Sequence, residues 1–334
     1  MLQEEVISAK PLRKVVFSLV RLGIGFGLVA YLAQSKVISF HALSKLFTAW
    51  PITLAALTLL FFDASLMALR LTWMFRPQGL YLSWTMAMRL TLIGCFFTTF
   101  LPGAAGGDIA KLFYASRENG GRKTEIITVV IFDRVIGLFS MLLLPMLFAP
   151  MFLRLIQGVA VLRFLLAIAA VLALGLLALA MLCLFNQPLV RLLERGAWRF
   201  SKWRNLALRA LETIGTYRST PATLVKVLGV SILANFSLIA VTALAVLAVN
   251  PSALAMKMCL VIPMGYIANS LPITPGGLGV GEAAFNALFH LTGLRGGAEA
   301  LLCWRIWSAF IGIVGLGIYL RGLRAGIFDS AGER

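Results

Sequence analysis

The sequence contains several long apolar stretches. Each is about as long as a helix that crosses a membrane. A helix needs about 20 predominantly apolar residues to span the hydrocarbon core of a bilayer. The pattern therefore predicts an all-α, polytopic membrane protein that forms one transmembrane domain over residues 1–334, with an uncleaved first span. The six predicted spanning helices cover residues 14–33, 50–69, 124–148, 162–185, 223–249 and 298–320.

Two further apolar regions, residues 81–117 and 257–290, are interrupted by a related element. The first contains Leu-Pro-Gly-Ala-Ala-Gly-Gly and the second Leu-Pro-Ile-Thr-Pro-Gly-Gly. Proline removes a backbone donor and breaks a helix, and glycine lets the backbone turn sharply. We therefore expect two re-entrant helical hairpins, with two ordinary full-length helical pairs as the alternative. The expected helix breaks are at Pro102, Pro272 and Pro275.

Basic residues determine the predicted orientation of these elements. The net charge is +17, and most Lys and Arg lie in the two terminal tails and in residues 70–89, 111–123 and 186–220. Basic loops lie on the cytoplasmic side, so we expect both termini inside the cell membrane. Residues 12–150 and 160–322 then each follow the order span, span, hairpin, span, in opposite orientations. Such an inverted repeat tolerates broken helices that line a central cavity.

The connector at residues 188–219 combines an apolar helical pattern with many basic side chains. We interpret it as an amphipathic helix in the cytoplasmic interface, with Trp198 and Trp203 at headgroup level and anionic phospholipid as its partner. The plainer alternative is a connector between the two halves that touches lipid. Nucleic acid is not an expected partner, because no compact soluble segment presents a basic face.

Metal and cofactor chemistry is not expected. The four cysteines lie in apolar runs without C-x-x-C spacing, and the two histidines, His41 and His290, are far apart in the sequence. The sequence also contains no P-loop and no G-x-S-x-G nucleophile motif. We therefore predict no metal, no cofactor and no catalytic residue, and a transporter rather than an enzyme.

A polar site is predicted between the two broken hairpins. A helix that restarts after a glycine pair directs free amides and the positive end of its dipole into the break, where an anion can bind. Arg134 follows Gly107 by 27 residues and Arg305 follows Gly277 by 28. An arginine at the centre of a span costs about 2.5–3.5 kcal/mol, so it should face a partner or water. The predicted substrate-binding residues are Gly106, Gly107, Asp108, Arg134, Gly276, Gly277, Glu282 and Arg305.

The acidic residues leave alternatives open. Asp108 and Glu282 are expected as counter-charges of the arginines, but Asp108 could equally cap the helix that begins near residue 109. Asp133 should point away from Arg134, because adjacent residues of a helix do not face each other. Asp63 is interpreted only as a partner of Arg70 or of the arginine at position 89. Two packing hairpins without a binding site are the simpler structural alternative.

Three segments resemble the lysylphosphatidylglycerol synthase transmembrane, or flippase-like, family. They are LPGAAGGDIAK, FDRVIGL and PITPGGLGVGEAAF. The resemblance covers residues 12 to 322 and implies that the protein handles a lipid or moves it between leaflets. Members are linked to lysyl-phosphatidylglycerol, polyprenyl-linked sugars and hopanoids, and the compact length suits the hopanoid-associated branch among others. The sequence has no soluble synthase domain, so aminoacyl transfer is not expected.

The leading hypothesis is therefore translocation of an anionic or polar-headgroup lipid bound near mid-membrane. One alternative is an integral-membrane transferase that uses Asp108 or Glu282 as its base. Another is a non-catalytic partner that recruits a lipid-biosynthesis enzyme through the basic segment 188–219, and an ion-coupled transporter of a small molecule is a further one. A homodimer or a lipid-biosynthesis enzyme is the expected protein partner.

Overall fold

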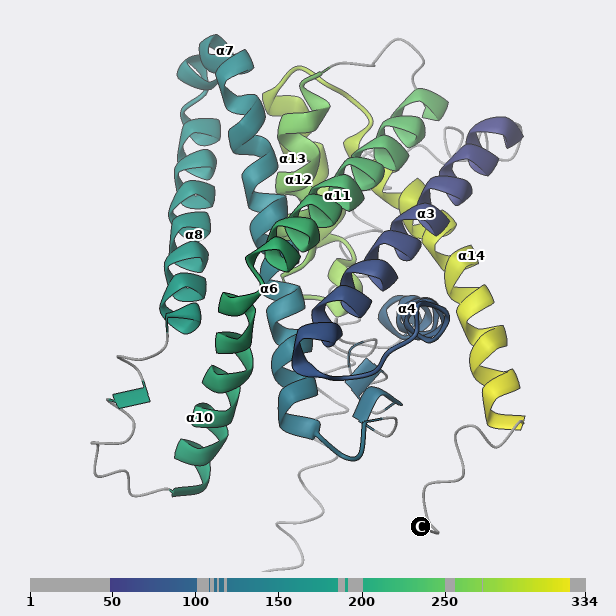
Figure 1. Cartoon of the computed structure of the whole chain (residues 1–334). Coiled ribbons are helices and arrows are strands. Elements are labelled where there is room, and N and C mark those ends of the chain that lie inside the picture. Colours follow the sequence, from purple (N-terminus) through teal and green to yellow (C-terminus); the bar gives the residue numbers. More distant parts are fainter. Residues whose placement is uncertain are drawn as a thin grey trace, which may run out of the picture.

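The computed structural model describes residues 49–100, 108, 111–112, 114–116, 119–185, 190–191, 201–249, 256–271 and 273–324. This part of the chain is built from helices and contains no strand (Figure 1). The fold class predicted from the sequence, an all-α polytopic membrane protein, is confirmed. The predicted first span at residues 14–33 lies outside the described residues, as do Pro102, Gly106, Gly107 and Pro272.

Five described helices are long and apolar enough to cross a membrane. Each agrees with a predicted span to within a few residues at its start. Pro51 lies in the first turn of the first of them, where its missing N–H costs no helical hydrogen bond. The five helices are α3 (Trp50–Phe75), α6 (Lys123–Phe148), α8 (Ala160–Leu184), α11 (Pro221–Val249) and α14 (Gly297–Arg324).

The second interrupted region forms two short helices on either side of a turn. Helix α12 (Met258–Asn269) and helix α13 (Val280–Leu291) pack against each other, and η4 (Pro275–Gly277) lies between them. Each helix has 12 residues, or about 18 Å at 1.5 Å per residue. Neither alone crosses a hydrocarbon core of about 30 Å, so the predicted break is present. Entry of this pair from one side of the membrane stays a prediction.

The first interrupted region begins with α4 (Trp84–Phe100), a helix of 17 residues. Beyond it, the described residues 108, 111–112 and 114–116 are helical as well. A short segment, η1 (Arg76–Gln78), connects α3 to the stretch that leads into α4. After the C-terminal end of α6, η2 (Ala149–Phe152) and α7 (Leu153–Gly158) lead the chain into α8.

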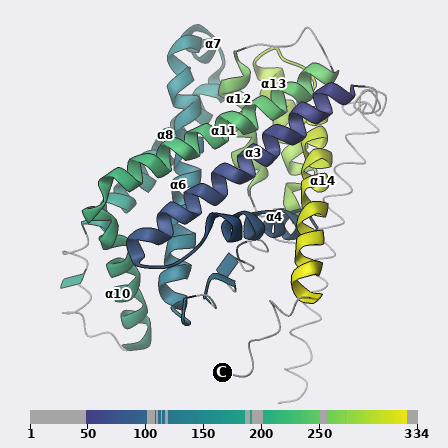
Figure 2. The ribbon, with the colours of Figure 1, turned by 45° about the vertical axis from the view of Figure 1, so that its right-hand side comes forward.

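Helices of the first half of the chain (residues 12–150) pack against helices of the second half (residues 160–322). Helices α3 and α11 lie side by side and run in opposite directions (Figures 1 and 2). Helix α4 of the first half packs against α14 of the second, and α12 of the second half packs against α6 of the first. Each interrupted region therefore lies against the last spanning helix of the other half.

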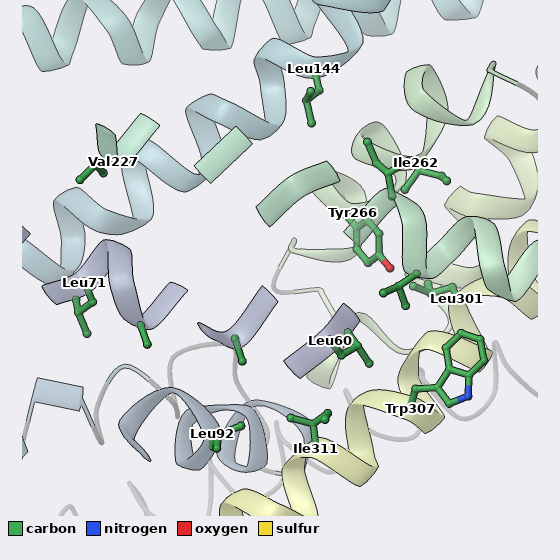
Figure 3. Close-up of a cluster of buried hydrophobic side chains, with 14 of the residues drawn as sticks. Leu60, Leu71, Leu92, Leu144, Val227, Ile262, Tyr266, Leu301, Trp307 and Ile311 are labelled. Atoms are coloured by element: carbon green, nitrogen blue, oxygen red, sulfur yellow. The ribbon is translucent and has the colours of Figure 1, made fainter. Parts of the chain in front are cut away.

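The buried core lies where these helices meet. Figure 3 shows Leu60 of α3, Tyr266 of α12 and Leu301 and Trp307 of α14 gathered in one cluster of buried side chains. The ring of Tyr266 stands edge-on to the rings of Phe285 and Trp304. In contrast, most side chains of α8 point outward and are apolar, which suits a helix in contact with lipid.

The basic connector docks on the spanning helices. Helix α10 (Ser201–Gly215) lies against α6 and α8, and η3 (Thr216–Ser219) follows it (Figure 1). The hydroxyl of the fully buried Tyr217 donates to the Met74 carbonyl of α3 at 2.6 Å, and Gln78 Nε2 donates to the Thr213 carbonyl at 2.6 Å. Burial raises the pKa of Tyr217 above its usual value, so the hydroxyl remains a donor. The interfacial position of α10 stays a prediction.

Gly315 of α14 sets how closely this helix approaches α4. A Cβ added at Gly315 would lie 2.0 Å from the Leu92 carbonyl oxygen of α4. We predict that Gly315→Ala forces the two helices apart and lowers the free energy of unfolding by about 1–3 kcal/mol. Thermal unfolding in detergent measures the effect.

Gly317, two residues further along α14, supplies the matched control. A Cβ there meets nothing within 4 Å, so Gly317→Ala should leave stability unchanged or raise it slightly. Equal unfolding temperatures for the two variants would contradict a close contact between α14 and α4.

Candidate functional site

The turn between α12 and α13 depends on a backbone that only glycine adopts readily. Gly276, Gly277 and Gly279 have φ angles of 61°, 69° and 78°, in the left-handed region that other residues rarely adopt. A Cβ on Gly277 would also lie 2.3 Å from the Asn269 carbonyl oxygen. The glycine pair therefore lets the chain turn back against the end of α12.

Arg305 of α14 holds this turn together through three donors. Its Nε donates to Glu282 Oε1 at 2.6 Å, its Nη1 to the Gly276 carbonyl at 2.6 Å, and its Nη2 to Asn269 Oδ1 at 2.7 Å. These acceptors belong to α13, the turn and α12. A single guanidinium thus fastens the broken helix pair to α14. We call Asn269, Gly276, Glu282 and Arg305 the Arg305 cluster.

Glu282 neutralises both Arg305 and the start of α13. It has 0% exposure, and its second oxygen accepts a hydrogen bond from the Gly279 amide at 2.7 Å. A carboxylate in the first turn also balances the positive end of the helix dipole. The Gly277 amide donates to the Thr274 carbonyl at 3.1 Å. In this structure the charges and amides of the second break are thus satisfied largely by the protein itself.

A second arginine, Arg134 of α6, forms a more open cluster. Arg134 Nε lies 2.7 Å from Asp108 Oδ2, and Lys111 Nζ lies 3.8 Å from the other oxygen of Asp108. We call these three residues the Arg134 cluster. The Arg134 side chain is 50% exposed, against 17% for Arg305. Asp108 is therefore a counter-charge of Arg134, as one of the two sequence interpretations required.

The two clusters have the same kind of ion pair but differ in how exposed the arginine is. In each, an acid that follows a glycine pair binds the arginine of the next spanning helix: Asp108 binds Arg134, and Glu282 binds Arg305. Both pairings were expected from the sequence. The Arg305 side chain is closed in by three acceptors, whereas its counterpart has one ion-pair partner among the described residues. Among the described residues, Arg134 is therefore the less enclosed of the two arginines.

The ion pair of Arg70 was not anticipated. Arg70 of α3 donates through Nε and Nη2 to the two carboxylate oxygens of Asp133 on α6, at 2.6 and 2.8 Å. Its Nη1 donates to Ser231 Oγ of α11 at 3.1 Å. Arg70 and Asp133 are both buried, so this link joins three spanning helices inside the protein. We call it the Arg70 pair.

The sequence offered only part of the signal for the Arg70 pair. The prediction that Asp133 points away from Arg134 is compatible with its contact with Arg70. The suggested pairing of Asp63 with Arg70 or Arg89 is not found: Arg70 takes Asp133 instead, and Asp63 feels Arg70 only through a longer-range electrostatic interaction. Asp133 lies 63 residues from Arg70 in the chain. Which acid pairs with Arg70 therefore depends on how α3 and α6 pack.

No group that could hold a metal is present in the described part of the chain, where no three His, Cys, Asp or Glu side chains gather. The four cysteines are free, and Cys303 is buried. The chemical capacity of the site therefore lies in guanidinium, ammonium and carboxylate groups. Guanidinium groups bind phosphate and carboxylate through paired hydrogen bonds.

Comparison with known proteins gave one match. The family model described as lysylphosphatidylglycerol synthase TM region matches residues 18–317. This range contains four of the five described spanning helices, most of α14, and the ion pairs of Arg70, Arg134 and Arg305. No curated protein and no solved structure matched the chain. The hopanoid-associated branch stays a prediction.

The Arg70 pair yields a prediction about stability. Asp133→Asn leaves the buried Arg70 guanidinium without a counter-charge, so the free energy of unfolding should fall by about 3–5 kcal/mol. Glu125→Gln is the control, because Glu125 faces the partly exposed Arg122 at 3.6 Å and such a pair contributes about 0–1 kcal/mol. Chemical unfolding in detergent compares the two variants. An Asp133→Asn protein as stable as Glu125→Gln would show that the Arg70 charge is compensated by another group.

Proposed function

Because this chain belongs to the family of the lysylphosphatidylglycerol synthase transmembrane region, and so has a membrane lipid-related function, we propose that it moves a lipid with an anionic headgroup between the leaflets of the cell membrane. The headgroup binds at the Arg134 cluster while the acyl chains remain in the surrounding lipid. Both chain termini lie on the cytoplasmic side, as the distribution of basic residues predicts.

The half-exposed side chain of Arg134 carries this proposal. Arg134 is 11 residues from the start of α6 at Lys123, which places it about 17 Å along the helix. A guanidinium at that depth needs a partner or water, since its insertion costs about 2.5–3.5 kcal/mol. Asp108 compensates it on one side through Nε. The exposure of this side chain supports binding of a phosphate-bearing headgroup by its guanidinium.

The reciprocal packing of the two halves supports a mechanism of alternating access. We propose that residues 12–150 and 160–322 form an inverted repeat around α3 and α11, which run in opposite directions side by side. The Arg305 cluster fastens α12, the turn and α13 to α14. Rocking of one repeat against the other then exposes the headgroup site to each leaflet in turn.

The state of the two acids favours translocation over lipid-transferase chemistry. A transferase needs a carboxylate that is free to accept a proton from its substrate. Asp108 is engaged by Arg134 and Lys111, and Glu282 is fully buried between Arg305 and the Gly279 amide. Both acids act as counter-charges in this arrangement, and neither is presented as a base.

We predict that Arg134→Ala slows leaflet exchange. Loss of a charge-assisted hydrogen bond of about 1.5–3 kcal/mol corresponds to a rate lower by about one to two orders of magnitude. The measurement is exchange of fluorescent phosphatidylglycerol in proteoliposomes. Arg163→Ala, which removes an exposed arginine of α8, should exchange at the wild-type rate.

Stability separates this effect from misfolding. The Arg134 side chain is half exposed, so Arg134→Ala should unfold in detergent at close to the wild-type temperature. Arg305→Ala should unfold at a lower temperature, because Glu282 would stay buried without its cation. Wild-type exchange rates in a folded Arg134→Ala protein would remove this arginine from the transport mechanism.

A further inference from the structure

Asp63 is an acidic side chain in the middle of α3 that neither arginine cluster uses. It lies 13 residues after Trp50, at the start of this helix of 26 residues, or about 20 Å along its axis. That position is near the centre of a hydrocarbon layer of about 30 Å. The side chain is partly exposed rather than fully buried. An ionised carboxylate at such a depth needs compensation.

The surroundings of Asp63 come from several helices. Arg70 on the same helix, the Cys95 thiol on α4 and the Tyr266 hydroxyl on α12 all lie within electrostatic reach of its carboxylate. The Cys95 thiol is also within electrostatic reach of Lys111 of the Arg134 cluster, and the Tyr266 hydroxyl is within reach of Arg305. Leu60, one turn earlier on α3, lies in the buried cluster with Tyr266 (Figure 3). Asp63 therefore lies within electrostatic reach of groups that belong to both halves of the chain.

Within the described part of the chain, Asp63 forms no hydrogen bond and no ion pair. Arg70 does not compensate it directly, because Arg70 donates to Asp133 through Nε and Nη2 and to Ser231 through Nη1. Tyr266 is also engaged, since its hydroxyl and Thr242 Oγ1 lie 2.8 Å apart. Among the described residues, no side chain therefore competes with a mobile cation for the Asp63 carboxylate.

The available ligands suit a proton and not a metal ion. A metal cation such as Ca²⁺ takes six to eight oxygen ligands, and Mg²⁺ requires an octahedral set. No cluster of three His, Cys, Asp or Glu side chains surrounds Asp63 among the residues that the structure describes. A proton needs only one acceptor oxygen. Neutralisation by a proton also removes the energetic cost of a charge at mid-membrane.

We propose that Asp63 is a proton-binding site that couples movement of the anionic headgroup to movement of one proton. The inference rests on the lipid translocation proposed above. Asp63 takes a proton from a hydronium ion on one side of the membrane, forming an O–H bond, and returns it to water on the other side. The headgroup at Arg134 and the proton at Asp63 bind cooperatively, because protonation removes a negative charge that would repel the headgroup. One proton and one anionic headgroup cross together without net charge.

The test is the distribution of fluorescent phosphatidylglycerol between the leaflets of proteoliposomes under an imposed pH gradient. With one proton per lipid, one pH unit should shift the steady-state ratio of the labelled lipid about tenfold in the wild-type protein. Asp63→Asn, which cannot titrate, should still exchange lipid but hold the ratio near unity at every gradient. Glu125→Gln makes the same chemical change near the start of α6 and should respond as the wild type does.

Two outcomes overturn the coupling. One is a wild-type leaflet ratio that ignores the gradient although exchange proceeds, and the other is an Asp63→Asn protein that responds as the wild type does. Absence of any wild-type exchange would instead refute the proposed translocation and the coupling with it.

Infrared difference spectroscopy tests the proton site independently of transport. A protonated-carboxyl band that titrates with pH should be present in the wild type and missing in Asp63→Asn, and its absence from the wild type refutes the site.

Discussion

A guanidinium inside a membrane must be compensated by the protein, because hydrocarbon offers it no hydrogen bond and no counter-charge. This constraint acts at three arginines of the described spanning helices. Arg70 binds Asp133, Arg134 binds Asp108, and Arg305 binds Glu282. Every pair links two different elements of the chain. These pairs join elements that pack against each other, and the proposed lipid site lies at the most exposed of the three arginines.

The three pairs differ in how completely the protein encloses them. We assign the two enclosed pairs a structural role and the exposed pair a role in lipid binding. The Arg70 pair is buried and joins α3, α6 and α11. The Arg305 cluster closes the break between α12 and α13, with Glu282 inaccessible to solvent. The Arg134 side chain is half exposed. The same chemistry therefore supplies two enclosed ion pairs that connect helices and one exposed arginine, which is the proposed headgroup site.

Particular residues show how far sequence reasoning reached. The five described spans were predicted because a spanning helix must be continuously apolar for about 20 residues. The break at Pro275 and the following glycines was predicted because these residues end helices locally. The position of Arg305 was expected from an approximate repeat of spacing, and Glu282 was expected as a counter-charge of the arginines. The bonds from Arg305 to Asn269 and to the Gly276 carbonyl left no mark in the sequence, because they depend on how α12, the turn and α14 come together.

The sequence alone determined the helical class, the positions of the five described spans and the presence of a break near Gly276 and Gly277. These features depend on apolar length and on backbone freedom, which are properties of neighbouring residues. Only the tertiary structure decided that Arg70 takes Asp133 and leaves Asp63 without an ion pair in the described part of the chain. It also decided that Arg134 stays more open than Arg305. The physical reason is that charge compensation inside a membrane acts between helices, and its partners are chosen by packing.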